Sequence, residues 1–120
     1  MSISHLFKSS PLQLKAILRI VGKEEPIFGP GRLQLLEHIE KTGSINQAAK
    51  NMGMSYKKAW QMISSMNAQA EKPLIVTQTG GSSGGGALIT PEGQEVMRFY
   101  EGLQKRFQAF LDEESKNLLV

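Results

Sequence analysis

Lysine, glutamine and serine recur between residues 56 and 72 at a spacing that would place them together on one face of a helix. At about 100° per residue, this stretch separates into a polar face and an apolar face. The polar face comprises Lys57, Gln61 and Ser64, with Lys58 and Ser65 at its flanks, and the apolar face comprises Ala59, Ile63, Met66 and Ala70.

The polar side chains have the chemistry that reads base edges in the major groove of DNA. Lysine binds phosphate or the acceptors of guanine, glutamine pairs with adenine, and serine serves either base. An ordinary solvated helix carries the same residue types, so the neighbouring elements decide between the two interpretations. Tyr56 and Trp60 fall at the edge of the apolar face, where we expect them to pack, with base stacking by Trp60 as the alternative.

Two serines followed by helix-forming residues predict the elements that hold this face in place. Ser44 can cap a short helix over residues 45–52, which Gly53 closes, and Ser55 can cap the helix over 56–72. Pro73 ends that helix because proline cannot continue it. Two helices joined this tightly form a helix-turn-helix candidate.

A glycine-rich loop, TGGSSGGGA at residues 79–87, lies between two short β-prone runs at 74–79 and 87–90. Such a hairpin beside a helix-turn-helix predicts a wing. Glycine amides approach phosphates closely and serine hydroxyls donate to them, so we expect the tip of the loop to contact DNA. The residues at the tip are Gly81, Ser82, Ser83 and Gly84.

The same glycines do not form a nucleotide-binding loop. The phosphate-loop pattern read from Gly80 meets Gly86 and Ala87 where a lysine and a hydroxyl residue should stand. Without them, the phosphates lack a cation and a magnesium ion lacks its ligand. We therefore expect no catalytic residues and no enzymatic activity.

The flanking segments complete the predicted fold. Alternating apolar residues predict a strand over 12–21, proline and glycine predict a turn over 22–31, and helical spacing predicts a helix from Arg32 that ends at Gly43. A last helix, over 91–116, is too long and too aromatic to be covered by a small domain, so we expect it to form a homodimer. Its apolar stripe comprises Val96, Phe99, Tyr100, Leu103, Phe107, Phe110 and Leu111.

Composition limits the other functions that this chain can have. With no cysteine and two histidines among 120 residues, it lacks the common metal ligands, and we expect neither a metal nor a cofactor. No apolar run is long enough for a membrane span, which favours a cytoplasmic protein. Residues 41–72 carry five lysines against one glutamate, whereas residues 92–116 carry an acidic excess, so a polyanionic partner is expected for the middle only.

Several motifs in this order resemble the DNA-binding domain of the ModE family of molybdate-responsive transcription regulators, over about residues 12–111. They are FGPG at 28–31, GSINQAAKNMGMSYKKAW at 43–60, MN at 66–67, the glycines of the wing, and LITPEG at 88–93. The helix-turn-helix alone is also similar to LysR-type regulators. The resemblance implies that Ser55, Tyr56, Lys57, Lys58 and Gln61 face DNA.

Two departures from the family pattern qualify what the resemblance implies. Ser82 and Ser83 stand where the family wing commonly has a basic residue, which weakens the expected contact with phosphate. The 120 residues stop before the β-barrel domains that bind molybdate in the full-length regulators, so we do not expect this chain to bind molybdate.

Together these observations predict a mainly α protein with a small antiparallel sheet, a winged helix-turn-helix. We expect an N-terminal tail at 1–11, the DNA-binding domain at 12–90 and a dimerisation helix at 91–120. The predicted partners are a second copy and double-stranded DNA with a two-fold symmetric operator, to which Ser44 also contributes. The alternative is a winged-helix module that binds a protein partner instead of DNA.

Overall fold

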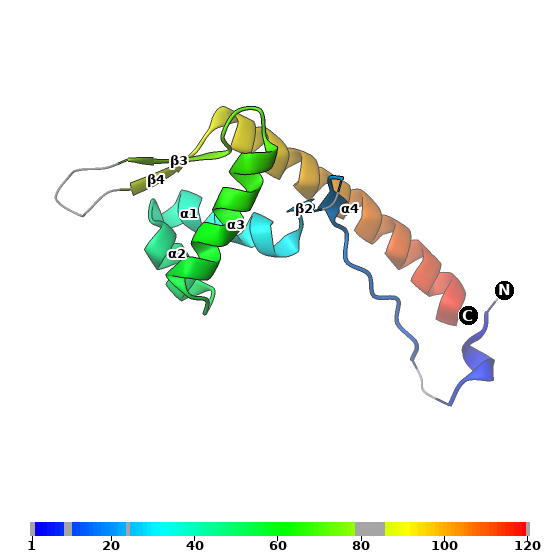
Figure 1. The fold of residues 1–120 in the computed structure, drawn as a ribbon. Helices are drawn as coiled ribbons and strands as arrows, with labels where there is room; N and C mark the ends of the chain where they lie inside the picture. The colour runs from blue at the N-terminus through cyan, green and yellow to red at the C-terminus, as the bar shows by residue number, and fades with distance from the viewer. Residues whose placement is uncertain (1, 9–10, 24, 79–85, 120) are drawn as a thin grey trace.

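Three short helices form the centre of the molecule in the computed structural model, which describes residues 2–8, 11–23, 25–78 and 86–119. They are α1 (Pro30–Thr42), α2 (Ile45–Asn51) and α3 (Tyr56–Gln69). A hairpin of β3 (Ile75–Gln78) and β4 (Gly86–Ile89) follows α3, and the long helix α4 (Pro91–Leu119) ends the fold (Figure 1). The predicted fold class is therefore confirmed.

The helix boundaries arise from caps and from two left-handed glycines. Ser44 Oγ accepts a hydrogen bond from the Gln47 amide, and Ser55 Oγ accepts one from the Lys58 amide, both at 3.0 Å. Gly43 ends α1 with φ of 69°, a conformation that glycine adopts without steric cost. α1 begins at Pro30, two residues before the predicted start, because proline is well suited to the first turn.

The hairpin is antiparallel and joins the helices at both ends. Ile75 pairs with Ile89 and Gln78 with Gly86, while residues 79–85, the predicted wing tip, lie outside the described residues. The amide of Ala87 donates to the carbonyl of Gly43 at 2.9 Å, which fixes β4 against the end of α1.

α3 ends at Gln69, three residues before the predicted end at Lys72. Asn67 explains the difference, because its Oδ1 accepts the amide of Leu74 at 2.8 Å and its Nδ2 donates to the carbonyl of Ile75 at 2.9 Å. These bonds hold the chain that enters β3 against α3. The chain therefore leaves the helix at Ala70, whose backbone is extended, before Pro73 can terminate it.

The predicted strand over 12–21 is wrong for most of its length. Only Ile20–Val21 forms a strand, β1, which pairs with β2 (Pro26–Phe28) inside the segment predicted as a turn. The alternation of residues 12–19 predicts extended backbone, and these residues have no regular secondary structure because no strand lies beside them in the described part of the chain.

The N-terminal residues lie near the far end of α4 (Figure 1). A single 3₁₀ turn, η1 (Ser4–Leu6), follows Ser2, whose hydroxyl donates to the carbonyl of Leu118 at 3.0 Å. The molecule is elongated, 62 × 29 × 24 Å, because the C-terminal part of α4 extends beyond the other helices (Figure 1). Within the described residues no helix has a stretch long and apolar enough to cross a membrane.

α4 starts on a tight junction with the hairpin. Thr90 caps the helix by accepting the Gly93 amide at 3.0 Å, and its hydroxyl donates to the carbonyl of Pro73 at 2.8 Å. A Cβ atom at Gly93 would stand 2.4 Å from the carbonyl oxygen of Leu74, so only glycine fits this position without a shift of the backbone. The first turns of α4 are thereby packed directly on β3.

The core lies between α1, α2, α3, the hairpin and the N-terminal half of α4. Its centre is an edge-to-face contact of Phe28 with Tyr100, whose ring centroids are 5.3 Å apart. The side chains that are almost completely buried are Phe28, Leu35, Leu36, Ile39, Ala48, Ala49, Ala59, Ile63, Met66, Ile75 and Tyr100.

Candidate nucleic-acid interface

α2 and α3 form the predicted helix-turn-helix. Residues 52–55 separate them, and Ala48, Ala49 and Ala59 are buried where the helices meet. Alanine allows a close approach of two helix backbones, and Gly53, with φ of 66°, makes the sharp turn possible. The end of α2 and the start of α3 are thus held at a fixed angle.

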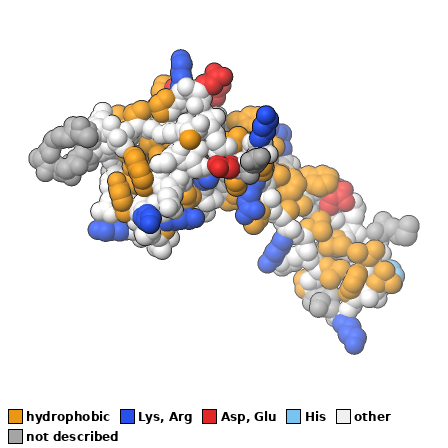
Figure 2. Space-filling view, viewed as in Figure 1, with side chains coloured by type: hydrophobic (Ala, Val, Ile, Leu, Met, Phe, Trp, Pro, Cys, Tyr) orange, Lys and Arg blue, Asp and Glu red, His pale blue; other side chains and the backbone are white. Residues whose placement is uncertain are grey.

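The two faces of α3 match the prediction. Ala59, Ile63 and Met66 are buried, whereas Lys57, Lys58, Gln61 and Ser64 are exposed. No aspartate or glutamate occurs between Ser44 and Ala70. In Figure 2, Lys and Arg side chains follow the lower edge of the molecule at α2 and the first turn of α3. This surface therefore attracts anions without competition from its own carboxylates.

Ser44 and Ser55 have a structural role whether or not they touch DNA. Their oxygens accept the amides at the N-termini of α2 and α3, which leaves each hydroxyl hydrogen able to donate to a partner. The two caps therefore position the helices, and contact with a phosphate remains a prediction.

Ser65 lies one turn after Gln61, at the flank of the polar face of α3. Its hydroxyl accepts from Arg32 Nη2 at 3.1 Å and is 3.3 Å from Gln69 Nε2. Because it is partly buried under these groups, Ser65 is placed to hold α3 against β2. Its hydroxyl is thus engaged within the chain, and a contact of Ser65 with DNA stays a prediction.

Arg32 is a positioning residue that the sequence does not predict. Besides Ser65, its Nη1 donates to the carbonyls of Pro26 at 2.8 Å and Ile27 at 2.9 Å, so one guanidinium joins α1, β2 and α3. Burial lowers the pKa of Arg32, and the nearby Glu25 opposes that shift. No residue pattern predicts this role, because two of the three partners of the guanidinium are backbone carbonyls.

The expectation that Tyr56 and Trp60 pack is wrong. Tyr56 retains 53% of its surface exposed and Trp60 retains 42%. Tyr56 stands in the first turn of α3, before its first buried residue, and Trp60 lies about 60° around the helix from Ile63. The core beside them is already filled by Ala59 and Ile63, so the two rings lie at the surface.

The predicted wing residues Gly81, Ser82, Ser83 and Gly84 lie outside the described residues. The strands that carry them are described, and they place the start and the end of the loop at Gln78 and Gly86. Their contact with DNA stays a prediction.

The apolar stripe of α4 divides into an inner and an outer part. Tyr100, predicted at the dimer interface, is completely buried, and its phenol donates to the carbonyl of Leu18 at 2.6 Å. It therefore belongs to the core of its own chain, and this burial raises the pKa of the phenol. Phe99 and Phe110 form the outer part, with 58% and 57% of their surfaces exposed.

The remaining stripe residues are partly buried. The ring of Phe110 stacks on that of Phe107 with centroids 6.3 Å apart. Phe107 and Leu111 face the extended segment 16–18, with which they line a small cavity of about 120 Å³. Val96 and Leu103 also retain some exposure. An exposed apolar edge thus runs along α4 beside the face that packs on its own core.

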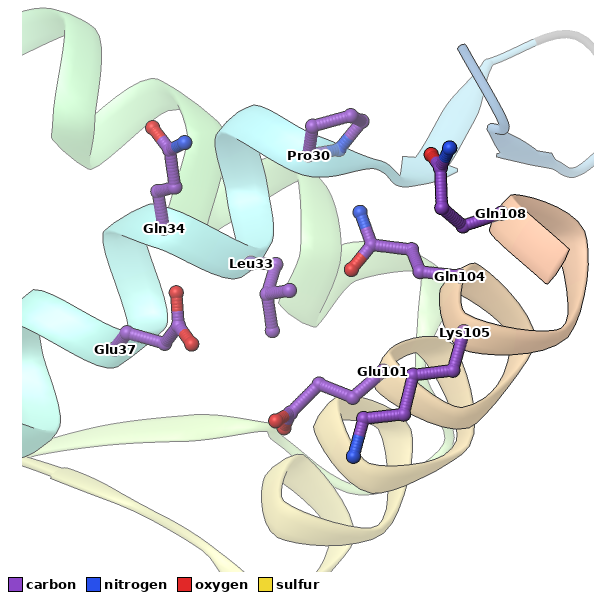
Figure 3. Close-up of a pocket in the computed structure, with 8 residues that line it drawn as sticks. All are labelled: Pro30, Leu33, Gln34, Glu37, Glu101, Gln104, Lys105 and Gln108. Atoms are coloured by element: carbon purple, nitrogen blue, oxygen red, sulfur yellow. The ribbon is translucent and has the colours of Figure 1, made fainter. Parts of the chain in front are cut away.

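A hollow of about 490 Å³ lies between α1 and α4, on a different part of the surface from α3 (Figure 3). Glu37 of α1 and Glu101 of α4 point into it, with Lys105 at its rim. Two carboxylates repel a polyanion, so this hollow does not extend the basic surface. Among the described residues no three carboxylate, histidine or cysteine side chains gather as a metal site would require.

Comparison with known proteins gives one family match. Residues 30–94, which run from the start of α1 to the first turn of α4, match the bacterial regulatory helix-turn-helix proteins of the LysR family. The matched region thus contains both helices of the helix-turn-helix and the hairpin.

Individual relatives extend beyond this region. The chain is 38% identical over 108 residues to the DNA-binding transcriptional dual regulator ModE of Escherichia coli K12, covering 87% of this chain and 41% of that protein. It is 45% identical over 87 residues to the molybdenum transport protein ModE of Azotobacter vinelandii, covering 72% and 32%.

A third relative is the molybdenum-pterin-binding protein MopB of Rhodobacter capsulatus, 37% identical over 91 residues, covering 76% of this chain and 34% of that protein. The resemblance to ModE proteins is therefore confirmed. The chain spans about two fifths or less of the length of these relatives.

Proposed function

The chain belongs to the bacterial regulatory helix-turn-helix proteins of the LysR family, and on that premise we propose that it binds duplex DNA sequence-specifically and regulates transcription. The observation that supports this most directly is α3, whose exposed face carries lysine, glutamine and serine and whose neighbourhood lacks carboxylates. Neither a catalytic step nor a cofactor is part of the proposal.

α3 is the recognition helix in this proposal. Lys57 and Gln61 lie one turn apart on the exposed side, opposite the buried Ala59 and Ile63, so seating the helix on its core presents both to a major groove. Gln61 pairs with an adenine edge in two hydrogen bonds, and Lys57 binds a phosphate or a guanine. Ser55, Lys58 and Ser64 contact the flanking backbone.

The second part of the proposal is a homodimer built on α4. Phe99, Leu103 and Phe110 form the exposed edge, which an antiparallel α4 of a second copy would cover. A two-fold dimer places its recognition helices in successive major grooves and requires an operator with matching symmetry.

The relatives' names connect them with molybdenum, and we extend the proposal to operators of genes for molybdenum handling. A regulator that binds such operators works in the cytoplasm of a bacterial cell. We expect no molybdate site within the 120 residues, which calorimetry with molybdate would test by showing no heat of binding.

Selection from random duplex DNA tests the proposed function. The protein is incubated with the pool, the bound fraction is sequenced, and affinity for the enriched site is measured over a range of salt. We expect a two-fold symmetric motif and a binding constant that falls with salt. No enrichment, together with no measurable binding to any duplex even at low salt, would refute DNA recognition and favour a protein partner.

A further inference from the structure

Tyr56 and Trp60 form a pair of exposed aromatic side chains one turn apart on α3. The described residues supply no hydrogen-bond partner to the phenol of Tyr56 or the indole N–H of Trp60, since neither takes part in a side-chain bond. Rings with an apolar body and a polar tip are typical of surfaces that bind another molecule. The pair therefore marks a contact surface rather than core packing.

The helix geometry places this pair on the flank of α3 that faces the hairpin. Asn67 lies seven residues after Trp60, two turns along the same side of the helix, and it bonds to Leu74 and Ile75 at the start of β3. Gln61 follows Trp60 by about 100° on the other side. The pair consequently lies between the base-reading face and the hairpin.

The position and chemistry of the flank select the kind of partner. A recognition helix in a major groove directs its central face at base edges, whereas its flanks face the sugar–phosphate strands that border the groove. Lys57 stands beside the pair, about 60° around the helix from Trp60, and α3 carries no acidic side chain. A polyanionic strand with apolar sugar faces fits these features, and an acidic peptide has no comparable sugar surface.

We propose that Tyr56 and Trp60 grip one sugar–phosphate strand of the bound duplex. The indole N–H and the phenol O–H donate to phosphate oxygens, and the two rings cover deoxyribose. This inference rests on the proposed function and adds a contact that supplies affinity without reading sequence. It also explains why both rings are exposed, which the packing of the chain alone does not explain.

Fluorescence tests whether the indole enters the interface, because Trp60 is the one tryptophan of the chain. Acrylamide should quench the free protein readily, since the ring is half-exposed, and should quench the complex much less. The same protection should appear with the selected site and with a random duplex at low salt. Unchanged quenching in a complex that forms normally would overturn the contact and leave the proposed function intact.

Substitutions separate the ring from its N–H group. Trp60→Ala should weaken binding about tenfold on selected and random duplexes alike, as expected for loss of a hydrogen bond to a charged group together with its apolar contact. Trp60→Phe should lose only part of that factor, and Tyr56→Phe should weaken binding less again. Phe7→Ala, an exposed aromatic at the far end of the molecule, is the matched control and should bind as the parent does.

Neutral methylphosphonate linkages, placed one at a time in the site, locate the phosphate. The parent should lose affinity at the contacted linkage, and Trp60→Phe should show no further loss there. A Trp60→Ala effect confined to the selected site, and removed when thymine is replaced by uracil, would assign the ring to a base and overturn the backbone contact. If the parent binds no duplex, the proposed function fails and this inference fails with it.

Discussion

α3 and α4 both leave a large part of their surface exposed, but the two surfaces have opposite chemistry. The exposed face of α3 carries lysines, glutamine and serine with no acidic residue. The exposed edge of α4 carries phenylalanine, with acidic side chains elsewhere along the helix. The α3 surface suits an anionic partner. The α4 edge suits an apolar partner, which the charged side chains of α3 could not cover.

The comparison teaches that exposure alone does not define a functional surface. On α3 the buried face, with Ala59, Ile63 and Met66, leaves the polar side free. Hydrogen bonds of Arg32 and Asn67 set the position of the helix. On α4 the apolar stripe is wider than the core that covers it. One edge of the stripe, with Tyr100, is buried, and the other edge, with Phe99 and Phe110, is exposed to solvent. The first arrangement suits a polyanion and the second suits an identical helix.

The largest expected effect comes from breaking the apolar edge of α4. Replacing Phe99 and Phe110 by serine should give a folded monomer, because both side chains are mostly exposed. Binding to a two-half-site operator should fall by about 10²–10⁴-fold, since the second half-site then no longer binds intramolecularly. Sedimentation and titration of the operator measure the two effects.

Tyr100→Phe is the control for that variant, because Tyr100 follows Phe99 in the chain but is buried in the core. It should lose the bond to Leu18 and about 0.5–1.5 kcal/mol of stability while remaining dimeric. If the parent protein sediments as a monomer at micromolar concentration, the proposed dimer interface on α4 is wrong.

Gln61→Ala should have the next largest effect. Loss of a bidentate contact should cost about 1–3 kcal/mol at one base position of the selected site. Binding to random duplex should be unchanged, because the lost bonds read a base and not the backbone. Affinities for the site and its single-base variants provide the measurement, and a uniform loss on every sequence would contradict a reading role.

Lys57→Ala tests the basic character of α3. If the ammonium group binds phosphate, the variant should weaken all duplexes similarly and reduce the salt slope by about one unit per half-site. Titrations at several salt concentrations give that slope. A loss restricted to one base position would assign Lys57 to guanine instead.

Ser65→Ala should have the smallest effect on DNA binding. Its hydroxyl is engaged by Arg32, so removal should lower stability by about 0.5–1.5 kcal/mol and leave affinity for the selected site nearly unchanged. Thermal unfolding and one binding titration are sufficient. A loss of affinity as large as that of Gln61→Ala would show that Ser65 belongs to the DNA-facing surface.

Much of the fold follows from local sequence signals. The serine caps of α2 and α3, the left-handed Gly43 and the periodicity of α3 and α4 are interactions between near neighbours in the chain, so the sequence predicts them well. The predicted polar and apolar faces of α3 agree with burial for the same reason.

The failures all depend on contacts between distant residues. Residues 12–19 alternate as a strand does, but a strand needs a neighbour, and β2 reaches only Ile20 and Val21. The stripe of α4 has the correct spacing, yet only the packing of Phe28 decides that Tyr100 belongs to the core. In the same way, the exposure of Trp60 depends on how completely smaller residues fill the core beneath it.

The junction of Thr90 and Gly93 has a mechanical consequence. One hydroxyl holds both the start of α4 and the entry to β3, and the missing side chain at Gly93 brings the helix into direct contact with the strand backbone. The start of α4 and the described strands of the hairpin are thus held together as one unit. Because Ala87 of β4 also bonds to Gly43 at the end of α1, a force applied to α4 would reach the hairpin strands and α1 together.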